Sequence, residues 1–257
     1  MKLTIGYFYP EELNLYGDTG NIEILLSRAK SRGFDTELIK ITPFTTVGSE
    51  LMSKINLVFM GGGPDAGQKE MYQDLVSNKG PFIKDYIESG GVALFICGSY
   101  QLLGKYYKSA DGSELKGLDI FDLHTVHYGL DKKRCVGNTV CTLNQSILDN
   151  PQFKAINKTG KYIVGFENHG GRTYLNKNSS LKPFANVISG FGNNAEDKTE
   201  GAHYKNSIGT YFHGPILSKN PHLADFLIIK ALGLEKLEDL DDTVINKAHS
   251  ALVQRFK

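Results

Sequence analysis

The sequence lacks the features that would assign it quickly to several classes of protein. It has 257 residues, of which 29 are basic and 28 acidic. The net charge of +1 therefore gives no indication of binding to nucleic acid or to an acidic membrane. Its apolar runs fall short of the roughly 20 residues that a membrane helix needs. Pro10, Glu11 and Glu12 come too early for a signal peptide. Three cysteines without an export signal are typical of a reducing cytosol rather than of a disulfide framework. We therefore expect a cytoplasmic protein that neither binds nucleic acid nor inserts into a membrane.

The first half of the chain alternates strand and helix patterns. Short apolar runs that predict strands cover residues 2–9, 35–41, 55–60 and 92–96, and helical patterns cover residues 20–33 and 81–91. This alternation predicts an α/β fold of three layers, in which a mostly parallel sheet is covered by helices on both faces. Ligands of such folds bind at the carboxyl ends of the strands.

From about Lys116 the pattern changes to short strand candidates separated by Gly and Asn turns. These candidates lie at 134–143, 161–168, 185–192 and 207–214, and they predict a more antiparallel second half that is still compatible with one sheet. Residues 222–233 predict an amphipathic helix, and an acidic segment follows. No linker separates domains, so we predict a single domain over 1–257 with a helical C-terminal extension at about 221–257.

Cys97 stands where a buried strand meets a helix, in the stretch "GVALFICGSYQLLG". A residue at such an elbow is held in a sharp turn that small neighbours permit, here Gly98 and Ser99, and its side chain is lifted clear of the sheet. A helix that begins at Ser99 or Tyr100 would place its positive end under the sulfur and favour the thiolate, which attacks carbonyl carbons. The alternative is a small buried hydrophobic residue, which free cysteine often is.

Cysteine chemistry needs a base, and two of the seven histidines lie in glycine-flanked loops after strand-like runs. These are His169 in "VGFENHGGR" and His213 in "IGTYFHGPIL". Spacing alone does not choose between them, because the partner of a catalytic cysteine is near in space rather than in sequence.

The glycine triplet Gly61–Gly63 ends the neighbouring parallel strand. Its amides, with the amide of Gly98, are candidates to stabilise an oxyanion, and the alternative is a tight turn. The same loop imitates two nucleotide-binding motifs. However, Pro64 removes an amide from the dinucleotide fingerprint, and Gln68 replaces the P-loop lysine. We therefore expect no nucleotide in this chain.

Three segments in order, "FICGSYQLLG", "FENHGGRTYL" and "GTYFHGPIL", follow "VFMGGGPD". In the sequence and the order of these segments, the chain resembles class I glutamine amidotransferase domains of the cobyric-acid-synthase-like (CobB/CobQ) branch, whose fold is flavodoxin-like. The resemblance covers nearly the whole chain, from "LNLYGDTGNI" to at least Pro221.

The resemblance implies a nucleophilic Cys97 with His213 as its base. It also implies that Gly62, Gly63, Gly98 and Gln101 contribute to substrate binding. Other class I enzymes carry a glutamate two residues after the histidine, where this chain has Pro215. We therefore expect a Cys–His dyad without a metal, and Glu167 is a weak candidate to orient the histidine.

A substrate carboxylate needs a cation, and the planar fork of arginine suits it. Arg134, in "DKKRCVGN", matches the substrate-binding position of the family, and Arg172 is the second candidate. A surface charge in a basic turn is the alternative for Arg134.

The resemblance further implies a glutaminase subunit that hydrolyses L-glutamine and passes ammonia to a Mur-ligase-like partner in a heterodimer. That partner would use ATP and Mg to amidate the D-glutamate of lipid II, so the complex would work near the inner face of the membrane and this chain would hold no cofactor. Two alternatives stay open: a catalytically silent regulatory subunit of the same fold, and a glutaminase that serves a different amidoligase of the cobyric-acid type. A third hypothesis is a hydrolase or chaperone-like protein of similar fold with a cysteine at the same kind of elbow. Such a protein would not need the segment "GTYFHGPIL", so the presence of this segment argues against it.

Overall fold

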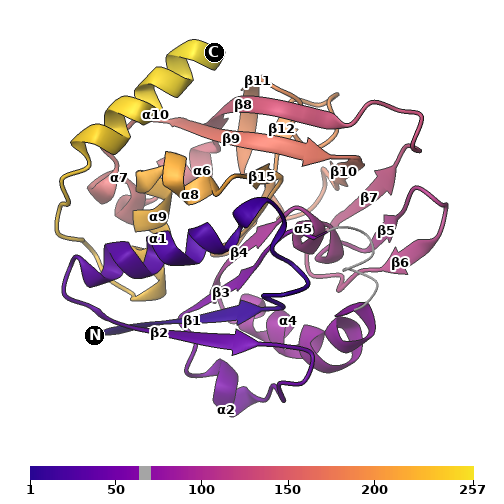
Figure 1. Cartoon of the computed structure of the whole chain (residues 1–257), viewed down its shortest axis with the longest axis horizontal. Coiled ribbons are helices and arrows are strands. Elements are labelled where there is room, and N and C mark those ends of the chain that lie inside the picture. The colour runs from indigo at the N-terminus through magenta and orange to yellow at the C-terminus, as the bar shows by residue number, and fades with distance from the viewer. Residues whose placement is uncertain (64–70) are drawn as a thin grey trace.

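The computed structural model describes residues 1–63 and 71–257. Pro64 and Gln68, on which the exclusion of nucleotide binding rests, lie outside the described residues. Helices and strands follow one another as Figure 1 shows. The helices are α1 (Thr19–Lys30), α2 (Ser49–Met52), α4 (Gly80–Glu88), α5 (Gly98–Leu102), α6 (Gln145–Leu148), α7 (Pro151–Ile156), α8 (Ile216–Lys219), α9 (Pro221–Ala231) and α10 (Thr243–Phe256), with a 3₁₀ turn η1 (Leu15–Gly17) and a π-helical turn η2 (Leu75–Lys79).

Within the described ranges the central sheet has the strand order β13-β14-β4-β3-β1-β2. Its strands are β1 (Lys2–Phe8), β2 (Asp35–Ile41), β3 (Leu57–Met60), β4 (Val92–Ile96), β13 (Ala202–Tyr204) and β14 (Ser207–Thr210). All neighbours run parallel except β13 and β14. The predicted α/β fold is confirmed, and the order 2-1-3-4-5 of its parallel strands is that of flavodoxin-like folds.

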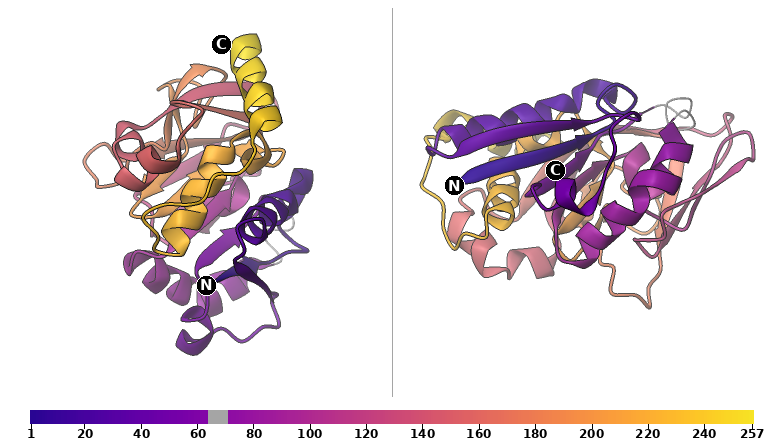
Figure 2. Two further views of the ribbon diagram at one scale, coloured as in Figure 1. Left: turned by 90° about the vertical axis from the view of Figure 1, so that its left-hand side faces the viewer. Right: turned by 90° about the horizontal axis from the view of Figure 1, so that it is seen from below.

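Helices cover both faces of this sheet, as the views in Figures 1 and 2 show together: α1 packs with α9 on one face, and α2 packs with α4 on the other. Every residue of β3 and β4 is buried, which explains their continuous apolar runs.

Of the second half of the chain only β13 and β14 continue the central sheet, so the prediction of a more antiparallel part of the same sheet is only partly met. The rest forms two further sheets among the described residues, with strand orders β10-β7-β5-β6 and β12-β11-β8-β9-β15. Their strands are β5 (Tyr106–Lys108), β6 (Glu114–Lys116), β7 (Leu123–His127), β8 (Cys135–Leu143), β9 (Tyr162–His169), β10 (Gly171–Leu175), β11 (Ala185–Ser189), β12 (Thr199–Glu200) and β15 (Phe212–His213). The run 207–214, predicted as one strand, divides at Tyr211, so that β14 joins the parallel sheet and β15 pairs with β9.

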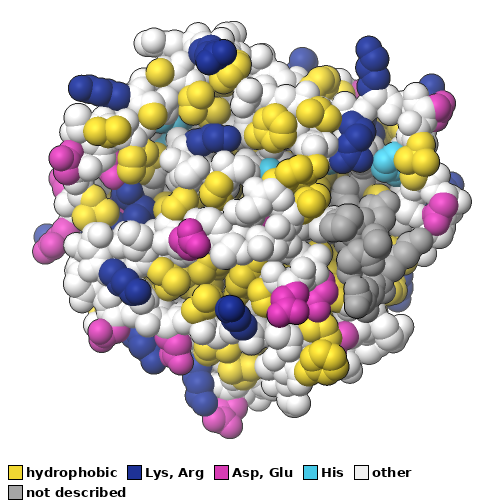
Figure 3. Space-filling view, in the orientation of Figure 1, with side chains coloured by type: hydrophobic (Ala, Val, Ile, Leu, Met, Phe, Trp, Pro, Cys, Tyr) yellow, Lys and Arg dark blue, Asp and Glu magenta, His cyan; other side chains and the backbone are white. Residues whose placement is uncertain are grey.

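The outer face of β8 and β9 is covered along part of its length by α10. Val253 packs there against Val140 and Val164. Further along the same face Val136 is 47% exposed. Figure 3 shows hydrophobic and basic side chains gathered over β8 and β9, on a face that the described helices cover only in part.

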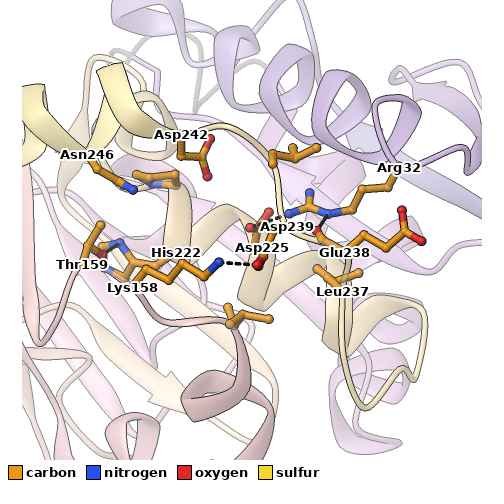
Figure 4. A pocket seen from close by; sticks show the side chains of 13 residues that line it. Arg32, Lys158, Thr159, His222, Asp225, Leu237, Glu238, Asp239, Asp242 and Asn246 are labelled. Carbon is orange, nitrogen blue, oxygen red and sulfur yellow. Dashed lines mark hydrogen bonds and ion pairs between the residues drawn. The ribbon is translucent and has the colours of Figure 1, made fainter.

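The helix predicted at 222–233 is present as α9, but it is buried along most of its length in the core rather than amphipathic. Ion pairs fix the segment that follows it. Arg28 of α1 bonds Asp225 of α9 and Asp242 before α10, at 2.6–2.8 Å. Figure 4 shows the small polar cavity of about 40 Å³ beside this network, where Arg32 also reaches Asp225. These ion pairs thus hold the segment just before α10 against α1 and α9.

No helix within 1–63 or 71–257 combines the length and the apolar character that crossing a bilayer requires.

Candidate active site

Cys97 directly follows β4 and takes φ +52° and ψ −104°. A non-glycine residue with positive φ is strained and persists only where its surroundings hold it. The amide of Cys97 donates to the carbonyl of Thr210 on neighbouring β14 at 2.8 Å, and the Ser99 hydroxyl lies 2.8 Å from the carbonyl of Met60 on β3. The predicted strand–turn–helix geometry is therefore present, with α5 beginning at Gly98, one residue earlier than expected.

His213, at the end of β15, lies beside this elbow. A Cβ added at Gly62 would lie 2.7 Å from His213 Cε1 and 3.1 Å from Cys97 Cβ, so the two side chains converge on this glycine. The Nδ1 of His213 is 3.2 Å from Oδ1 of Asp18, and neither side chain has exposed surface. The Nε2 of His213 has no hydrogen-bond partner among the described residues. One ring nitrogen is thus oriented by a carboxylate, and the other remains for proton transfer.

The electrostatic surroundings of His213 favour its protonated form. Burial alone would lower the pKa of the ring, but the interactions of the ring with Cys97 and with the carboxylate of Asp18 outweigh burial and raise the pKa of His213 to about 10. At neutral pH the ring therefore holds a proton, which a leaving amine needs in acyl transfer.

The sequence analysis missed Asp18. It lies just before α1, at the carboxyl edge of the sheet where Cys97 also lies, and its side chain makes no capping bond to its own helix. Instead Oδ2 accepts a hydrogen bond from the amide of Gly62 at 2.8 Å while Oδ1 faces His213. The signal that could have found it is an acidic residue at the start of the helix that follows the first strand, inside the segment "LYGDTGN". The structure thus adds a carboxylate, Asp18, beside the histidine of the predicted Cys97–His213 dyad, and we refer to the three residues as the triad.

Glu167, the candidate considered for orienting His213, is bonded elsewhere. Its carboxylate accepts from the amides of Phe191 at 3.0 Å and Gly192 at 2.8 Å. Burial raises the pKa of Glu167, and burial together with the charge of Glu167 raises the pKa of Glu200 to about 8. These two carboxyl groups form a buried pair apart from the triad, and the hypothesis for Glu167 was wrong.

His169 differs from His213 in every contact. Its Nδ1 lies 2.8 Å from the carbonyl oxygen of Gly171, and its ring stacks on Tyr211 at 3.6 Å between centroids. Burial lowers the pKa of His169 to about 3, so the ring is neutral. Gln101 is buried beside this stack and donates to the Tyr211 hydroxyl at 3.1 Å. The structure therefore distinguishes the two histidines, and His213 is the one beside Cys97.

The glycine loop packs against the segment that carries Asp18. A Cβ atom added at Gly61 would lie only 2.2 Å from the carbonyl oxygen of Leu13, so this position has no space for a residue larger than glycine. The Gly62 amide bonds Asp18, so serving as an oxyanion donor would require it to turn away from that carboxylate. The roles of Gly63 and Gly98 stay predictions.

The two candidate arginines occupy different environments. Arg134 is exposed, and its Nε and Nη2 donate to the side-chain and backbone oxygens of Asn168 at 3.1 and 3.0 Å. Arg172 is buried, donates to the carbonyl of Lys133 at 2.9 Å and lies over the Tyr128 ring. Arg172 therefore braces the loop, whereas Arg134 stands at the surface in a position to meet a ligand.

The described part of the chain contains no group of three or more histidine, cysteine, aspartate or glutamate side chains that could hold a metal ion.

This fold and site define a class of enzyme. The chain belongs to the CobB/CobQ-like glutamine amidotransferase domain family, whose profile matches residues 4–221. The resemblance predicted from sequence is thereby confirmed.

Among individual relatives, the chain is 38% identical over 258 residues to the lipid II isoglutaminyl synthase (glutamine-hydrolyzing) subunit GatD of Staphylococcus aureus, with 99% of this chain and 96% of the relative aligned. The corresponding subunit of Streptococcus pneumoniae is 36% identical over 241 residues, with 93% and 84% aligned. A probable cobyric acid synthase of Methanocaldococcus jannaschii is 32% identical over 187 residues, but this is 34% of its length. The glutaminase domain of Trypanosoma brucei CTPS shares the fold at a TM-score of 0.57 and 10% identity, with 92% of this chain and 98% of that domain aligned.

Proposed function

We propose that this chain is the glutaminase subunit of a lipid II isoglutaminyl synthase. It hydrolyses L-glutamine to glutamate and ammonia, and a Mur-ligase-like partner uses that ammonia to amidate D-glutamate of lipid II to D-isoglutamine. The observation that carries the proposal is the convergence of Cys97, His213 and Asp18, because a regulatory or purely binding subunit has no need of a strained cysteine beside an oriented histidine.

The geometry supports a two-step acyl transfer. The Cys97 thiolate attacks the side-chain carbonyl carbon of glutamine, and the resulting oxyanion is stabilised by backbone amides. Imidazolium His213 donates its proton to the leaving nitrogen, the C–N bond breaks, and a thioester remains. A water molecule then attacks the thioester while His213 accepts its proton, so that glutamate leaves and the cysteine is restored. Asp18 keeps Nε2 of the ring directed at the reaction throughout.

Arg134 is the group we assign to the α-carboxylate of glutamine, because an exposed guanidinium at the mouth of the site can form a bidentate pair. Gln101 and the glycine amides complete the proposed substrate site. Lipid-linked substrate would bring the complex to the inner face of the membrane, while ATP and Mg would bind the partner.

The partner has a candidate docking area. Ammonia has to reach the acceptor before it is protonated and lost to solvent, so we place the ligase subunit over the mouth of the Cys97 site. The uncovered part of β8 and β9, where hydrophobic and basic side chains gather in Figure 3, borders that mouth and supports this placement. The loops around His169 and His213 and the C-terminal helix are further candidates for contact.

A second candidate function is ammonia supply to a cobyric-acid-type amidoligase, favoured by the identity to cobyric acid synthases. Those matches span about a third of the relatives' length, whereas the GatD alignments span most of both chains. Full-length similarity to a separate subunit supports the lipid II assignment.

The proposal is tested by a change of nitrogen source. The Cys97→Ala chain, purified with the Mur-ligase-like subunit of the same organism, should lose glutamine-dependent amidation of a lipid II precursor and keep amidation with free ammonium. Mass spectrometry of the product measures both, and Cys141→Ala, which alters a buried thiol of β8, is the matched control. Failure to form a complex, or full glutamine-dependent activity of the Cys97 variant, would contradict the proposal. Amidation of a corrinoid carboxylate instead would transfer the assignment to the second candidate.

A further inference from the structure

Tyr16 holds an unusual conformation next to the triad. Its φ and ψ are 57° and 25°, in the left-handed region that a bulky aromatic residue rarely adopts, and Gly17 follows with φ 75°. Such a conformation is unfavourable and persists where neighbouring contacts hold it, often at functional sites. The amide of Leu15 donates to the carbonyl of Gly62 at 2.8 Å, and Asn14 accepts from the amide of Thr19 at 2.9 Å. The first bond joins the strained turn to the glycine loop of the active site, and the second closes the turn on itself.

The ring of Tyr16 lies over the catalytic histidine. The Tyr16 and His213 rings meet edge to face, with centroids 5.0 Å apart and planes at 73°. Tyr16 is 46% exposed, whereas His213 and Asp18 have no exposed surface. Tyr16 thus contributes to separating the histidine–aspartate pair from solvent.

The hydroxyl of Tyr16 reaches in the other direction, toward the proposed substrate arginine. It accepts a hydrogen bond from Nδ2 of Asn168 at 2.5 Å. Asn168 in turn accepts from Nε and Nη2 of Arg134. Asn168 therefore occupies one edge of the guanidinium fork and fixes its plane, and a fork has a second edge through which a carboxylate binds. A side-chain path runs from Arg134 through Asn168 and Tyr16 to His213.

We propose that Tyr16 is a positioning residue that couples Arg134 to His213, its hydroxyl orienting the arginine through Asn168 and its ring shielding the His213–Asp18 pair. This inference rests on the proposed function, since it requires glutamine to bind Arg134. Preorganising a long exposed side chain reduces the rotamer entropy lost when the carboxylate binds, so the hydroxyl contributes to glutamine affinity. The ring contributes to proton transfer instead, because it keeps water from weakening the electrostatic interactions of His213 with its neighbours. The titratable groups that face His213 are Asp18, Cys97 and His169.

Two substitutions separate these effects in the complex with the ligase subunit. Tyr16→Phe removes the hydroxyl and keeps the ring, so KM for glutamine should rise roughly 2- to 10-fold, the effect of one lost hydrogen bond, with kcat unchanged. Tyr16→Ala removes both, so kcat should also fall. Solvent would then weaken the interactions of His213 with Cys97 and Asp18, and the apparent pKa in the kcat profile should move down toward the ordinary value of histidine.

The coupling is measured on an Arg134→Ala background, where Tyr16→Phe should raise KM no further because the oriented group is gone. Tyr204→Phe is the matched control: that hydroxyl lies 3.2 Å from Glu88, near the amino ends of the parallel strands, and KM should stay at the wild-type value. A wild-type KM for Tyr16→Phe, or an equal rise of KM with and without Arg134, would overturn the coupling while the glutaminase function stands. An inactive wild-type complex would instead refute the proposed function and the coupling with it.

Discussion

Replacing Asp18 by asparagine should slow glutamine hydrolysis without unfolding the chain. The carboxylate has two acceptor oxygens, one for the Nδ1–H of His213 at 3.2 Å and one for the Gly62 amide at 2.8 Å. Asparagine has the same shape but one acceptor, so its NH₂ group must face one of the two donors. The substitution also removes the charge that helps to raise the pKa of His213.

The magnitude follows from the loss of one hydrogen bond to a charged group in a buried site. Such a bond contributes about 1.5–3 kcal/mol, which corresponds to roughly 10- to 150-fold in kcat/KM. The sign of the pH effect follows from the raised pKa of about 10. A histidine pKa raised on folding adds stability below its unfolded pKa near 6.5, and this stability is lost as pH rises toward 10. In Asp18→Asn the pKa of His213 should fall, so less stability is lost over this range.

Glutamate release by the complex, measured from pH 6 to 9.5, and chemical denaturation at the same pH values test both effects. Glu167→Gln is the matched control, because it neutralises a buried carboxylate that bonds Phe191 and Gly192 rather than His213. If Asp18→Asn kept wild-type kcat/KM and the wild-type pH profile, Asp18 would have no part in orienting the base.

Three further outcomes are expected. His213→Ala should lower kcat about a hundredfold or more, because proton transfer is lost, and steady-state kinetics should show a smaller loss for His169→Ala; the reverse order would mean that the wrong histidine has been assigned. Arg134→Ala should raise KM for glutamine roughly 10- to 100-fold with little change in kcat, whereas an unchanged KM in the same assay would assign the carboxylate to Arg172. Glu200→Gln should change the pH dependence of stability: the raised pKa of about 8 means that the folded wild type keeps a proton that the unfolded chain loses above about 4.5, so its stability falls as pH rises between these values. Urea denaturation at pH 5 and pH 8 should show a smaller fall in the variant, and an equal fall would place the retained proton on another group.

Local patterns predicted the parallel half of the fold well. The strands β2 and β4 match their predicted ranges residue for residue. For β4 the reason is that a short buried strand is a short apolar run, whereas β2 is a partly exposed edge strand in which polar residues are interspersed with apolar ones. The Cys97 elbow was predictable because its strand, cysteine, small residues and helix are consecutive in the chain.

The parts that failed depend on contacts between distant segments. The run 207–214 carries no local signal of its division, since Tyr211 leaves the parallel sheet to stack on His169 and to donate its amide to Glu200. Asp18 was missed because its partner His213 lies 195 residues away. Glu167 was a weak candidate for orienting His213, and β9 in fact carries its side chain to the face opposite the one that Phe166 and His213 share.

The order of the three proposed catalytic side chains along the chain has a consequence for synthesis. Asp18 and Cys97 leave the ribosome early in synthesis. Two strands come after residue 206: β14, whose carbonyl at Thr210 accepts a hydrogen bond from the amide of Cys97, and β15, which carries His213. Contacts of such long separation form late in folding. A nascent or truncated chain therefore presents a thiol without its base, and glutamine is spared from hydrolysis until the residues after 206 have been made and folded.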